Sequence, residues 1–410
     1  MAIIEIRGVT KIFGSHPEAA LVRLREGAGR EALLADTNHT VALRDVSLAI
    51  EKGQIFVVMG LSGSGKSTLI RHINRLIDPT AGNIIVDGVD VTELAIAELI
   101  SFRRDRLAMV FQHFALLPHR TVIDNIAYGL ELQGIHRAER RKRAQEWVDA
   151  VGLAGFERQY PAQLSGGMRQ RVGLARALCV DANILLMDEA FSALDPLIRS
   201  QMQDLLMELQ VRLRKTIVFI THDLDEALRL GDQIAILRDG EVVQIGPPAE
   251  ILLNPADDYV RAFVKDVNRS RVLTVETVMQ PPLLRLSSET PERALVEMQK
   301  KGAGFGYVVA GSTFRGLVTE EGLRSPSGKT TDLSDAIEDV TTIAPNATLA
   351  EALPKALASI HPIAVVDGEG ALKGVVSARA LAEVLNPHDA TEDAANVARN
   401  LTASTPARAK

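Results

Sequence analysis

The sequence predicts an α/β protein built from two parts. Three observations support this fold class: a glycine-rich loop directly follows a short apolar run near residue 60, further short apolar runs end in polar residues, and the last third of the chain repeats one layout. Apolar runs of about four to eight residues are typical of buried strands and are too short for most helices. The 410 residues, 46% of them hydrophobic, leave room for more than one core.

The glycine-rich loop, Gly60 to Thr68, has the pattern G-x-x-x-x-G-K-S and follows the apolar run Gln54–Met59. It therefore falls where a buried parallel strand turns into a helix. Glycines allow successive backbone N–H groups to point at phosphate oxygens, and the helix adds the positive end of its dipole. Lys66 would place a cation at the β- and γ-phosphates, and the Ser67 hydroxyl would bind Mg²⁺. The predicted phosphate-binding residues are Gly60, Leu61, Ser62, Gly63, Ser64, Gly65, Lys66, Ser67 and Thr68.

A second glycine-rich segment, Leu164–Gln170, precedes the helical pattern Arg171–Leu178. Ser165, Gly166 and Gly167 would present a hydroxyl and two bare amides at the helix N-terminus, where an anion can bind. An ordinary serine cap followed by glycines is the alternative, but two glycines in a first turn cost about 1 kcal/mol each relative to alanine. A single nucleotide cannot fill both anion sites of one protomer, so the second site needs another partner.

The two segments together resemble the ATP-binding-cassette (ABC) family, in which the second segment covers the γ-phosphate of an ATP held by a partner subunit. The resemblance implies a head-to-tail homodimer with two sandwiched ATP molecules. It implies that Ser165, Gly166, Gly167 and Gln170 contact the nucleotide of the other subunit. It also implies a P-loop ABC ATPase domain with a mixed-sheet core and a helical subdomain at about residues 92–165.

Two carboxylates follow the buried-strand pattern Ala182–Met187. This order places Asp188 and Glu189 at the carboxyl edge of the sheet, beside the phosphate-binding loop. Asp188 resembles the Walker B carboxylate that orients the Mg²⁺ shell, and Glu189 resembles the general base that polarises the attacking water. His222, at the end of the strand pattern Thr216–Thr221, resembles the switch histidine that contacts the γ-phosphate. A lone histidine at a strand end is usually structural, so His222 depends on its place in this ordered set.

Other parts of the family's site are also matched. Gln112 resembles the Q-loop glutamine, which joins the Mg²⁺ and water site to the helical subdomain, so the expected Mg²⁺ ligands are Ser67, Gln112 and Asp188. Asp195 matches the D-loop, which crosses the dimer seam. Residues 113–119 would lie near a groove that receives a coupling helix of a membrane partner.

Phe13 stands where the family carries an aromatic residue that stacks on adenine. Its flat face suits that contact. Core packing is the alternative, because aromatic residues are common in protein cores.

Composition fits a protein that works at a membrane without spanning it. No uncharged apolar stretch approaches the roughly 20 residues that cross a bilayer, and we expect no secretion signal in Met1–Arg7. The single cysteine, Cys179, excludes an internal disulfide and is expected to be a small buried hydrophobe. A net charge of −6 argues against a dedicated nucleic-acid binder. The basic run His136–Arg143 is interpreted as a solvated helix face, with contact to anionic lipid as the alternative.

The first domain is expected to cover residues 1–268. Near its end, the strand patterns Gln233–Arg238 and Glu241–Ile245 flank Asp239 and Gly240, a strong signal for a two-residue hairpin turn. Prolines at 247 and 248 then break the chain before a helical stretch that runs through Val264.

Two segments of similar layout, at about 272–325 and 333–388, follow this domain. Each contains a helix, a strand, a turn, a second strand and a helix, and together they resemble a tandem pair of cystathionine-β-synthase-type (CBS) modules over 272–390. Many such modules bind adenine nucleotides through an acidic residue, but Gly322 and Ala380 stand at the two equivalent positions. This departure puts AMP or ATP binding in doubt and favours dimerisation or sensing of ionic strength. Residues 391–410 lack apolar periodicity and are expected to be disordered.

Residues at about 15–40 form an insertion, expected to be helical, between the first strand and the strand that leads to the phosphate-binding loop. Loops longer than about 15 residues seldom lack a purpose, although a peripheral helix without function is the alternative. The insertion, the loop at 59–68, the segment 187–198 and the CBS pair together resemble the ATPase subunits of importers for glycine betaine, proline betaine and related quaternary-amine osmoprotectants. The likeness covers nearly the whole chain.

This resemblance implies a peripheral ATPase on the cytoplasmic face of the inner (cell) membrane. Two copies would drive integral-membrane permease subunits, which work with a periplasmic or extracellular substrate-binding protein. Choline, carnitine or another amine are alternative substrates, since the substrate does not touch this chain. Soluble ABC ATPases of DNA repair or ribosome rescue usually carry two cassettes or long coiled-coil or zinc inserts, which this sequence lacks. A regulator without turnover is disfavoured by the intact Glu189 and His222.

Overall fold

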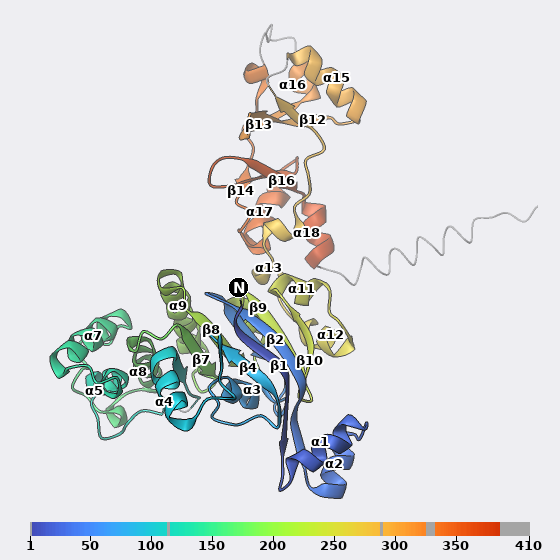
Figure 1. Ribbon diagram of the computed structural model, residues 1–410. Coiled ribbons are helices and arrows are strands. Elements are labelled where there is room, and N and C mark those ends of the chain that lie inside the picture. The colour runs from blue at the N-terminus through green and yellow to red at the C-terminus, as the bar shows by residue number, and fades with distance from the viewer. Residues whose placement is uncertain (1, 113–114, 288–289, 325–332, 386–410) are drawn as a thin grey trace, which may run out of the picture. The chain divides into compact units, whose positions relative to one another are not determined.

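The computed structural model describes residues 2–112, 115–287, 290–324 and 333–385 (Figure 1). It divides into two compact units, Met1–Asp266 and Val267–Lys410. The tail at 391–410, expected to be disordered, lies outside the described residues, as do positions 113 and 114 of the segment expected near a coupling helix. In the described part of the chain, no helix is both long and apolar enough to cross a membrane.

Within the described residues, the first unit contains a six-stranded sheet in the order β10-β9-β3-β8-β7-β6. Its strands are β3 (Ile55–Met59), β6 (Leu107–Val110), β7 (Ile184–Asp188), β8 (Thr216–Thr221), β9 (Gln233–Arg238) and β10 (Glu241–Gly246). All neighbours are parallel except β10 and β9, so the predicted mixed sheet is confirmed. Every residue of β3, β7 and β8 is buried, as expected for parallel strands covered on both faces. The carboxyl ends of these three strands meet at one edge, where the site is expected.

A second, antiparallel sheet has the order β2-β1-β4-β5 among the residues described. Its strands are β1 (Ala2–Phe13), β2 (Thr40–Glu51), β4 (Ala81–Val86) and β5 (Val89–Asp90). One apolar core joins this sheet to β3 and to α3 (Lys66–Ile73), with Ile4, Val58, Leu69 and Val86 among its members. Each fully buried aliphatic side chain contributes about 1.5–3 kcal/mol, so this core fixes α3 and the loop before it.

Helices α4 (Ile96–Arg106), α5 (Val122–Ile126), α7 (Arg137–Ala150), α8 (Gly166–Cys179) and α9 (Pro196–Leu213) gather at one side of the first unit (Figure 1). The unit also contains α6 (Tyr128–Leu132) and α10 (Leu224–Leu230). Helices α5 to α8 share a core that includes Val148 and Cys179. Burial raises the pKa of the Cys179 thiol to about 12, so this residue is the buried hydrophobe that the sequence predicted. The arginines of α7 are exposed or partly exposed, and three of them, Arg140, Arg141 and Arg143, pair with nearby acids, in agreement with a solvated helix face.

The insertion forms two helices at the far end of the β1–β2 pair, α1 (Pro17–Arg25) and α2 (Arg30–Thr37) (Figure 1). They pack on the strands through a small separate core formed by Ile12, Ala20, Leu24, Leu33 and Val41. An ion pair of 2.7 Å between Arg23 and Asp36 joins the two helices.

The predicted hairpin turn lies between β9 and β10, and both Asp239 (φ 53°) and Gly240 (φ 81°) have the positive φ that such turns require. The helical stretch expected through Val264 was wrong in one respect: it is two helices, α11 (Pro248–Leu253) and α12 (Asp258–Val264). Pro255 has no backbone N–H to continue α11. The Asp257 side chain then starts α12 by accepting a hydrogen bond of 2.8 Å from the N–H of Val260.

The second unit shows the predicted repeat. Its two sheets, β11-β12-β13 and β14-β15-β16 in the described residues, each combine a parallel pair with an antiparallel pair. The first repeat has β11 (Arg285–Ser287), α15 (Pro291–Lys301), β12 (Phe305–Ala310), β13 (Thr313–Thr319) and α16 (Glu320–Arg324). The second has β14 (Thr342–Ile343), α17 (Leu349–Ala358), β15 (Ile363–Val366), β16 (Leu372–Val376) and α18 (Ala378–Leu385), while α13 (Arg269–Val272) and α14 (Val275–Val278) precede both repeats. The repeats share one core around Tyr307, whose hydroxyl donates to the Pro362 carbonyl at 2.6 Å.

Candidate functional site

The loop between β3 and α3 contains three glycines, and at two of them a larger residue would not fit. A Cβ at Gly60 (φ 151°) would lie 2.2 Å from the Leu237 carbonyl oxygen, and one at Gly65 (φ 102°) would lie 2.6 Å from that of Ala42. Gly63 (φ 80°) faces open space, so only its backbone conformation favours glycine. These contacts seat the loop closely on β9 and β2.

The other residues of the loop divide by exposure. Leu61 and Ser62 are exposed at the surface of the loop, whereas Ser64 is buried, and its hydroxyl has no hydrogen-bond partner among the described residues. Thr68 lies inside α3, where its carbonyl bonds to the ring of His72 at 2.6 Å. Thr68 can therefore reach a nucleotide only through its side chain or its N–H group.

Lys66 is folded back on its own loop. Its ammonium group donates to the carbonyls of Gly60 at 2.8 Å and Leu61 at 3.0 Å, and the residue is only 4% exposed. Burial lowers the pKa of Lys66, while the nearby carboxylates of Glu189 and Asp188 raise it. A phosphate that entered the loop would offer this buried cation charge-assisted hydrogen bonds, which are stronger than bonds to neutral carbonyls.

Asp188 and Ser67 meet at the end of β7 and the start of α3. The Ser67 hydroxyl donates to the Asp188 carboxylate at 2.8 Å, and Arg71 lies 3.3 Å from the second carboxylate oxygen. In the described residues, no group of three or more His, Cys, Asp or Glu side chains could hold a metal. Nucleotide-bound Mg²⁺ needs no such cage, because one or two protein oxygens, phosphates and waters complete its octahedron. The hydroxyl and carboxylate oxygens therefore fit this ion.

Glu189, Gln112 and His222 come together from three distant parts of the sequence. The Gln112 amide donates to the Glu189 carboxylate at 3.1 Å, and Nδ1 of His222 lies 3.6 Å from the same oxygen. Glu189 has φ 47°, and its N–H is anchored to the Ile220 carbonyl at 3.1 Å. A partly buried carboxylate oriented by an amide and an imidazole can accept a proton from water.

A polar network behind His222 was not found by sequence reasoning. The buried carboxylate of Glu226 accepts hydrogen bonds from Thr221 at 2.6 Å and Gln203 at 3.1 Å, and burial raises its pKa. Asp223 is paired with Arg199 at 3.1 Å, and Arg199 also donates to the Leu194 carbonyl at 3.2 Å. The network thus joins the segment before α9 to the residues that flank His222. An Asp followed three residues later by Glu at the start of α10 is a capping signal that could have pointed to it.

Ser165 and Asp195 cap neighbouring helices. Ser165 accepts from the Met168 N–H at 3.3 Å at the start of α8, and Asp195 accepts from the Ile198 N–H at 3.1 Å at the start of α9. A Cβ at Gly167 would lie 2.6 Å from Cγ2 of Ile198, so the two helix starts touch, whereas Gly166 has open space beside it. The structure therefore places the two predicted dimer segments side by side.

Gln170 differs from its neighbours in the same segment. Its side chain is fully buried, and neither amide atom has a hydrogen-bond partner among the residues that the structure describes. Because the amide is inside the protein, it cannot contact a nucleotide of another subunit unless α8 moves. The expected contact from Gln170 is not supported by this geometry.

Phe13 is 42% exposed, so core packing does not explain it. It pairs with Thr40 across the β1–β2 ladder, two residues from Ala42, whose carbonyl packs on Gly65. Lys11 lies 5.1 Å from the centre of its ring. The ring is therefore exposed to solvent with the Lys11 ammonium over it, on a strand that pairs with β2, the strand that contacts the phosphate-binding loop.

A groove of about 610 Å³ is lined in part by Phe111, the residue before Gln112 in the chain. Residues from α4, β6, α6 and α8 line it, together with Leu117 from the segment expected near a coupling helix. The lining combines apolar side chains such as Ile100 and Leu132 with three arginines, Arg103, Arg104 and Arg176, so the groove offers both apolar and basic surface to a protein segment.

Comparisons with known proteins agree with these observations. The family described as ABC transporter matches residues 43–192, and the family described as CBS domain matches residues 332–387. The chain is 47% identical over 393 residues to the glycine betaine/proline betaine transport system ATP-binding protein ProV of Salmonella typhimurium, covering 94% of this chain and 98% of the relative. It is 48% identical over 380 residues to the glycine betaine/carnitine transport ATP-binding protein GbuA of Listeria monocytogenes, with coverages of 92% and 96%.

A third relative covers less of the chain. The trimethylamine N-oxide transport system ATP-binding protein TmoW of Ruegeria pomeroyi is 51% identical over 271 residues, which span 66% of this chain and 79% of the relative. Among solved structures, the dimeric ATP-binding cassette MJ0796 in a post-hydrolysis state with ADP and Pi matches with a TM-score of 0.51 and 34% identity. This match covers 60% of this chain and 98% of that one.

Proposed function

Because the chain belongs to the ABC transporter family of ATP-binding subunits, we propose that this ATPase energises an importer of glycine betaine, proline betaine or a similar quaternary amine. The observation that carries the proposal is the extent of the likeness. Relatives named for glycine betaine transport match over 92–94% of this chain, which includes the insertion and the second unit. The trimethylamine N-oxide relative matches over only 66% of it.

The proposed ATP site uses the residues around the loop between β3 and α3. The loop amides and Lys66 hold the β- and γ-phosphates, for which Lys66 must leave the carbonyls of Gly60 and Leu61. Ser67 and Asp188 would hold Mg²⁺, and the ion when bound neutralises charge on the phosphate oxygens. Gln112, the third predicted ligand, is bonded to Glu189 and would have to turn towards the ion to bind it. The exposed ring of Phe13 is available to stack on adenine.

Glu189 is proposed as the general base. Its carboxylate is oriented by Gln112 and lies next to His222. From there it can accept a proton from the water that attacks the γ-phosphorus, while His222 contacts the γ-phosphate.

We also propose that two copies complete each other's sites. Ser165 and Gly166 are open at the start of α8, and Asp195 lies at the start of the adjoining α9. This arrangement suits a head-to-tail dimer in which they cover the ATP of the other copy. In this proposal the buried Gln170 packs inside its own protomer and does not contact the nucleotide.

The remaining parts of the chain are assigned to partners and regulation. The groove lined in part by Phe111 would receive a cytoplasmic helix of an integral-membrane permease, which places the protein at the cytoplasmic face of the membrane. The unit at 1–268 would hydrolyse ATP, and the CBS pair at 272–390 would regulate it.

The test is uptake of labelled glycine betaine into proteoliposomes that contain the ATPase and its co-purified permease, supplied with the substrate-binding protein that works with this permease. Unlabelled proline betaine should compete at least as well as choline, carnitine or trimethylamine N-oxide. Preferred uptake of one of the last three would transfer the assignment to that amine. If no amine is taken up while ATP is hydrolysed, the importer proposal fails.

A further inference from the structure

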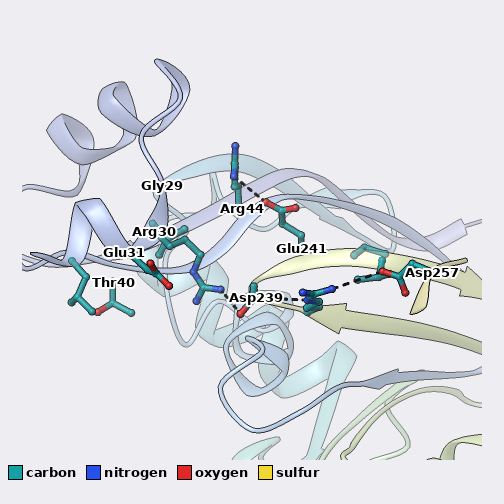
Figure 2. Close-up of a pocket in the computed structure, with 13 residues that line it drawn as sticks. Gly29, Arg30, Glu31, Thr40, Arg44, Asp239, Glu241 and Asp257 are labelled. Carbon is teal, nitrogen blue, oxygen red and sulfur yellow. Dashed lines mark ion pairs between the residues drawn. The ribbon is translucent and has the colours of Figure 1, made fainter. Parts of the chain in front are cut away.

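A pocket of about 810 Å³ lies between α2, the start of β2 and the β9–β10 hairpin (Figure 2). Charged side chains of both signs line it, and its arginines are already paired with carboxylates. The ion pairs are Arg30 with Asp239 at 3.2 Å, Arg44 with Glu241 at 3.2 Å, and Arg238 with Asp239 at 3.5 Å and Asp257 at 3.9 Å. Since these charges already compensate one another, the pocket is better understood as a junction between elements than as a ligand site.

The hairpin side of this junction supports the phosphate-binding loop. Gly240 donates its N–H to the Ser64 carbonyl at 3.1 Å and accepts from the Arg44 N–H at 2.9 Å. A Cβ at Gly65 would lie 3.6 Å from Cα of Gly240. The turn at Asp239 and Gly240 therefore lies against the outer side of the loop.

A second connection reaches the loop from the same turn. The guanidinium of Arg238, 3.5 Å from Asp239, lies 4.9 Å from the centre of the Tyr259 ring, a cation–π distance. Burial raises the pKa of the Tyr259 hydroxyl, and the nearby backbone of Leu61, in the loop, partly opposes this rise. The β9–β10 turn thus lies close to the loop at Leu61, through Arg238 and Tyr259, as well as at Ser64, to which Gly240 is bonded.

The insertion reaches this turn through Arg30, the first residue of α2. The other ion pair of the insertion, Arg23 with Asp36, stays within it. Figure 2 shows Arg30 and Asp239 facing each other across the pocket. An ion pair therefore joins the insertion to the β9–β10 turn, which packs against the phosphate-binding loop.

We propose that Arg30 is a positioning residue for ATP binding. By holding Asp239, it fixes the turn and the Arg238–Tyr259 pair against the outer side of the phosphate-binding loop, so the insertion stabilises the loop in its binding conformation. The inference rests on the proposed function only in that the loop binds ATP. It assigns a role to the insertion in the affinity for ATP, separate from the hydrolysis step at Glu189.

The test is the affinity of the full-length protein for a fluorescent ATP analogue, compared with the steady-state kinetics of ATP hydrolysis. Arg30→Ala should raise the Kd and the KM about two- to five-fold, the range expected from an exposed ion pair, and leave kcat at saturating ATP within two-fold. Arg30→Lys should restore most of the affinity. Asp239→Asn should raise the Kd similarly, because asparagine tolerates the positive φ of this position but lacks the charge. Arg30→Ala should add little to the Kd in the Asp239→Asn background.

Arg23→Ala is the matched control, because it removes an ion pair of the same type that does not reach the hairpin. It should bind ATP like the wild type. The Kd ratio of Arg30→Ala to wild type should also fall towards one as salt rises from 0.1 to 1 M, since the Debye length shrinks from about 10 to 3 Å.

Three results would overturn the proposal: an unchanged Kd in Arg30→Ala at 0.1 M salt, an equal rise in Arg23→Ala, or a ratio that does not change with salt. Failure of the wild type to bind the analogue would instead contradict the proposed ATPase function, so the two failures are distinguishable.

Discussion

Glu189 has a left-handed backbone that a non-glycine residue adopts only at a cost of about 1–2 kcal/mol. Hydrogen bonds offset this cost: its N–H is bonded to Ile220, and its carbonyl accepts from the Ser192 hydroxyl at 2.9 Å. Such strain is common where a side chain must be aimed at a reaction. Here it turns the carboxylate towards Gln112 and His222 at the edge of the sheet.

Substitutions at Glu189 and Lys66 should impair different steps, ATP hydrolysis in the first case and ATP binding in the second. Glu189→Gln keeps the loop and should still bind ATP, but it should hydrolyse ATP at least about 100-fold more slowly because the base is lost. Lys66→Ala removes the buried cation and should weaken ATP binding itself. Equilibrium binding and single-turnover hydrolysis, measured on both variants, separate these effects. Wild-type hydrolysis by Glu189→Gln in the assembled transporter would remove Glu189 from the role of base.

For individual residues, the sequence predicted which side chains come together but not which of them are buried. Gln112, Asp188, Glu189 and His222 were expected from motif order, and the structure brings them to one edge. The burial of Gln170 was not foreseen, because a motif states chain order and not which side of a helix faces the core.

The starts of α8 and α9 form one surface element, since Gly167 packs against Ile198. This contact affects the choice of variant. An acidic side chain at Gly167 would collide with Ile198 and disturb folding, whereas Gly166 has open space.

Gly166→Asp should therefore block dimerisation without loss of the protomer's own ATP site. The new carboxylate would face the γ-phosphate of the other copy, and like charges at short range repel. Light scattering on a Glu189→Gln background should show ATP-dependent dimers that disappear on the added change. Gly166→Ala is the control, because it adds a methyl group without charge and should still dimerise. Dimers of normal stability in Gly166→Asp would contradict the shared site.

Element types were predictable because strands and helices have different apolar periods. The strands β3, β7 and β8 lie within two residues of their predicted bounds at each end. The division of the stretch before Val264 into α11 and α12 was missed because apolar residues continue across the break. Pro255 and the capping Asp257 contained the missing signal.

At the scale of the whole molecule, the second unit has a core of its own but no carboxylate at the two positions where adenine nucleotides are bound in CBS modules. The N–H groups of Gly322 and Ala380 instead bond to the side chains of Thr319 at 3.0 Å and Ser377 at 3.1 Å. The N–H groups at these two positions therefore form hydrogen bonds that stabilise the first turns of α16 and α18. Control by ionic strength remains our prediction for this unit.

Deletion of residues 272–410 should leave ATP hydrolysis intact but flatten its activation by salt in liposomes with anionic lipid. Contacts between exposed charges weaken as the Debye length falls from about 10 Å at 0.1 M salt to about 3 Å at 1 M, which would release an inhibited transporter. Hydrolysis measured against salt concentration checks this, with neutral liposomes as the control. Unchanged activation after the deletion, or tight AMP binding by the full-length protein, would contradict the prediction.

In the proposed function, hydrolysis at the site around Glu189 drives import of a quaternary amine. The most direct measurement is ATP-dependent uptake of labelled glycine betaine by proteoliposomes that contain the permease and its substrate-binding protein, with either the wild-type ATPase or Glu189→Gln. We predict sustained accumulation with the wild type and none beyond a single turnover with the variant. Equal accumulation with both, or accumulation without ATP, would contradict the claim.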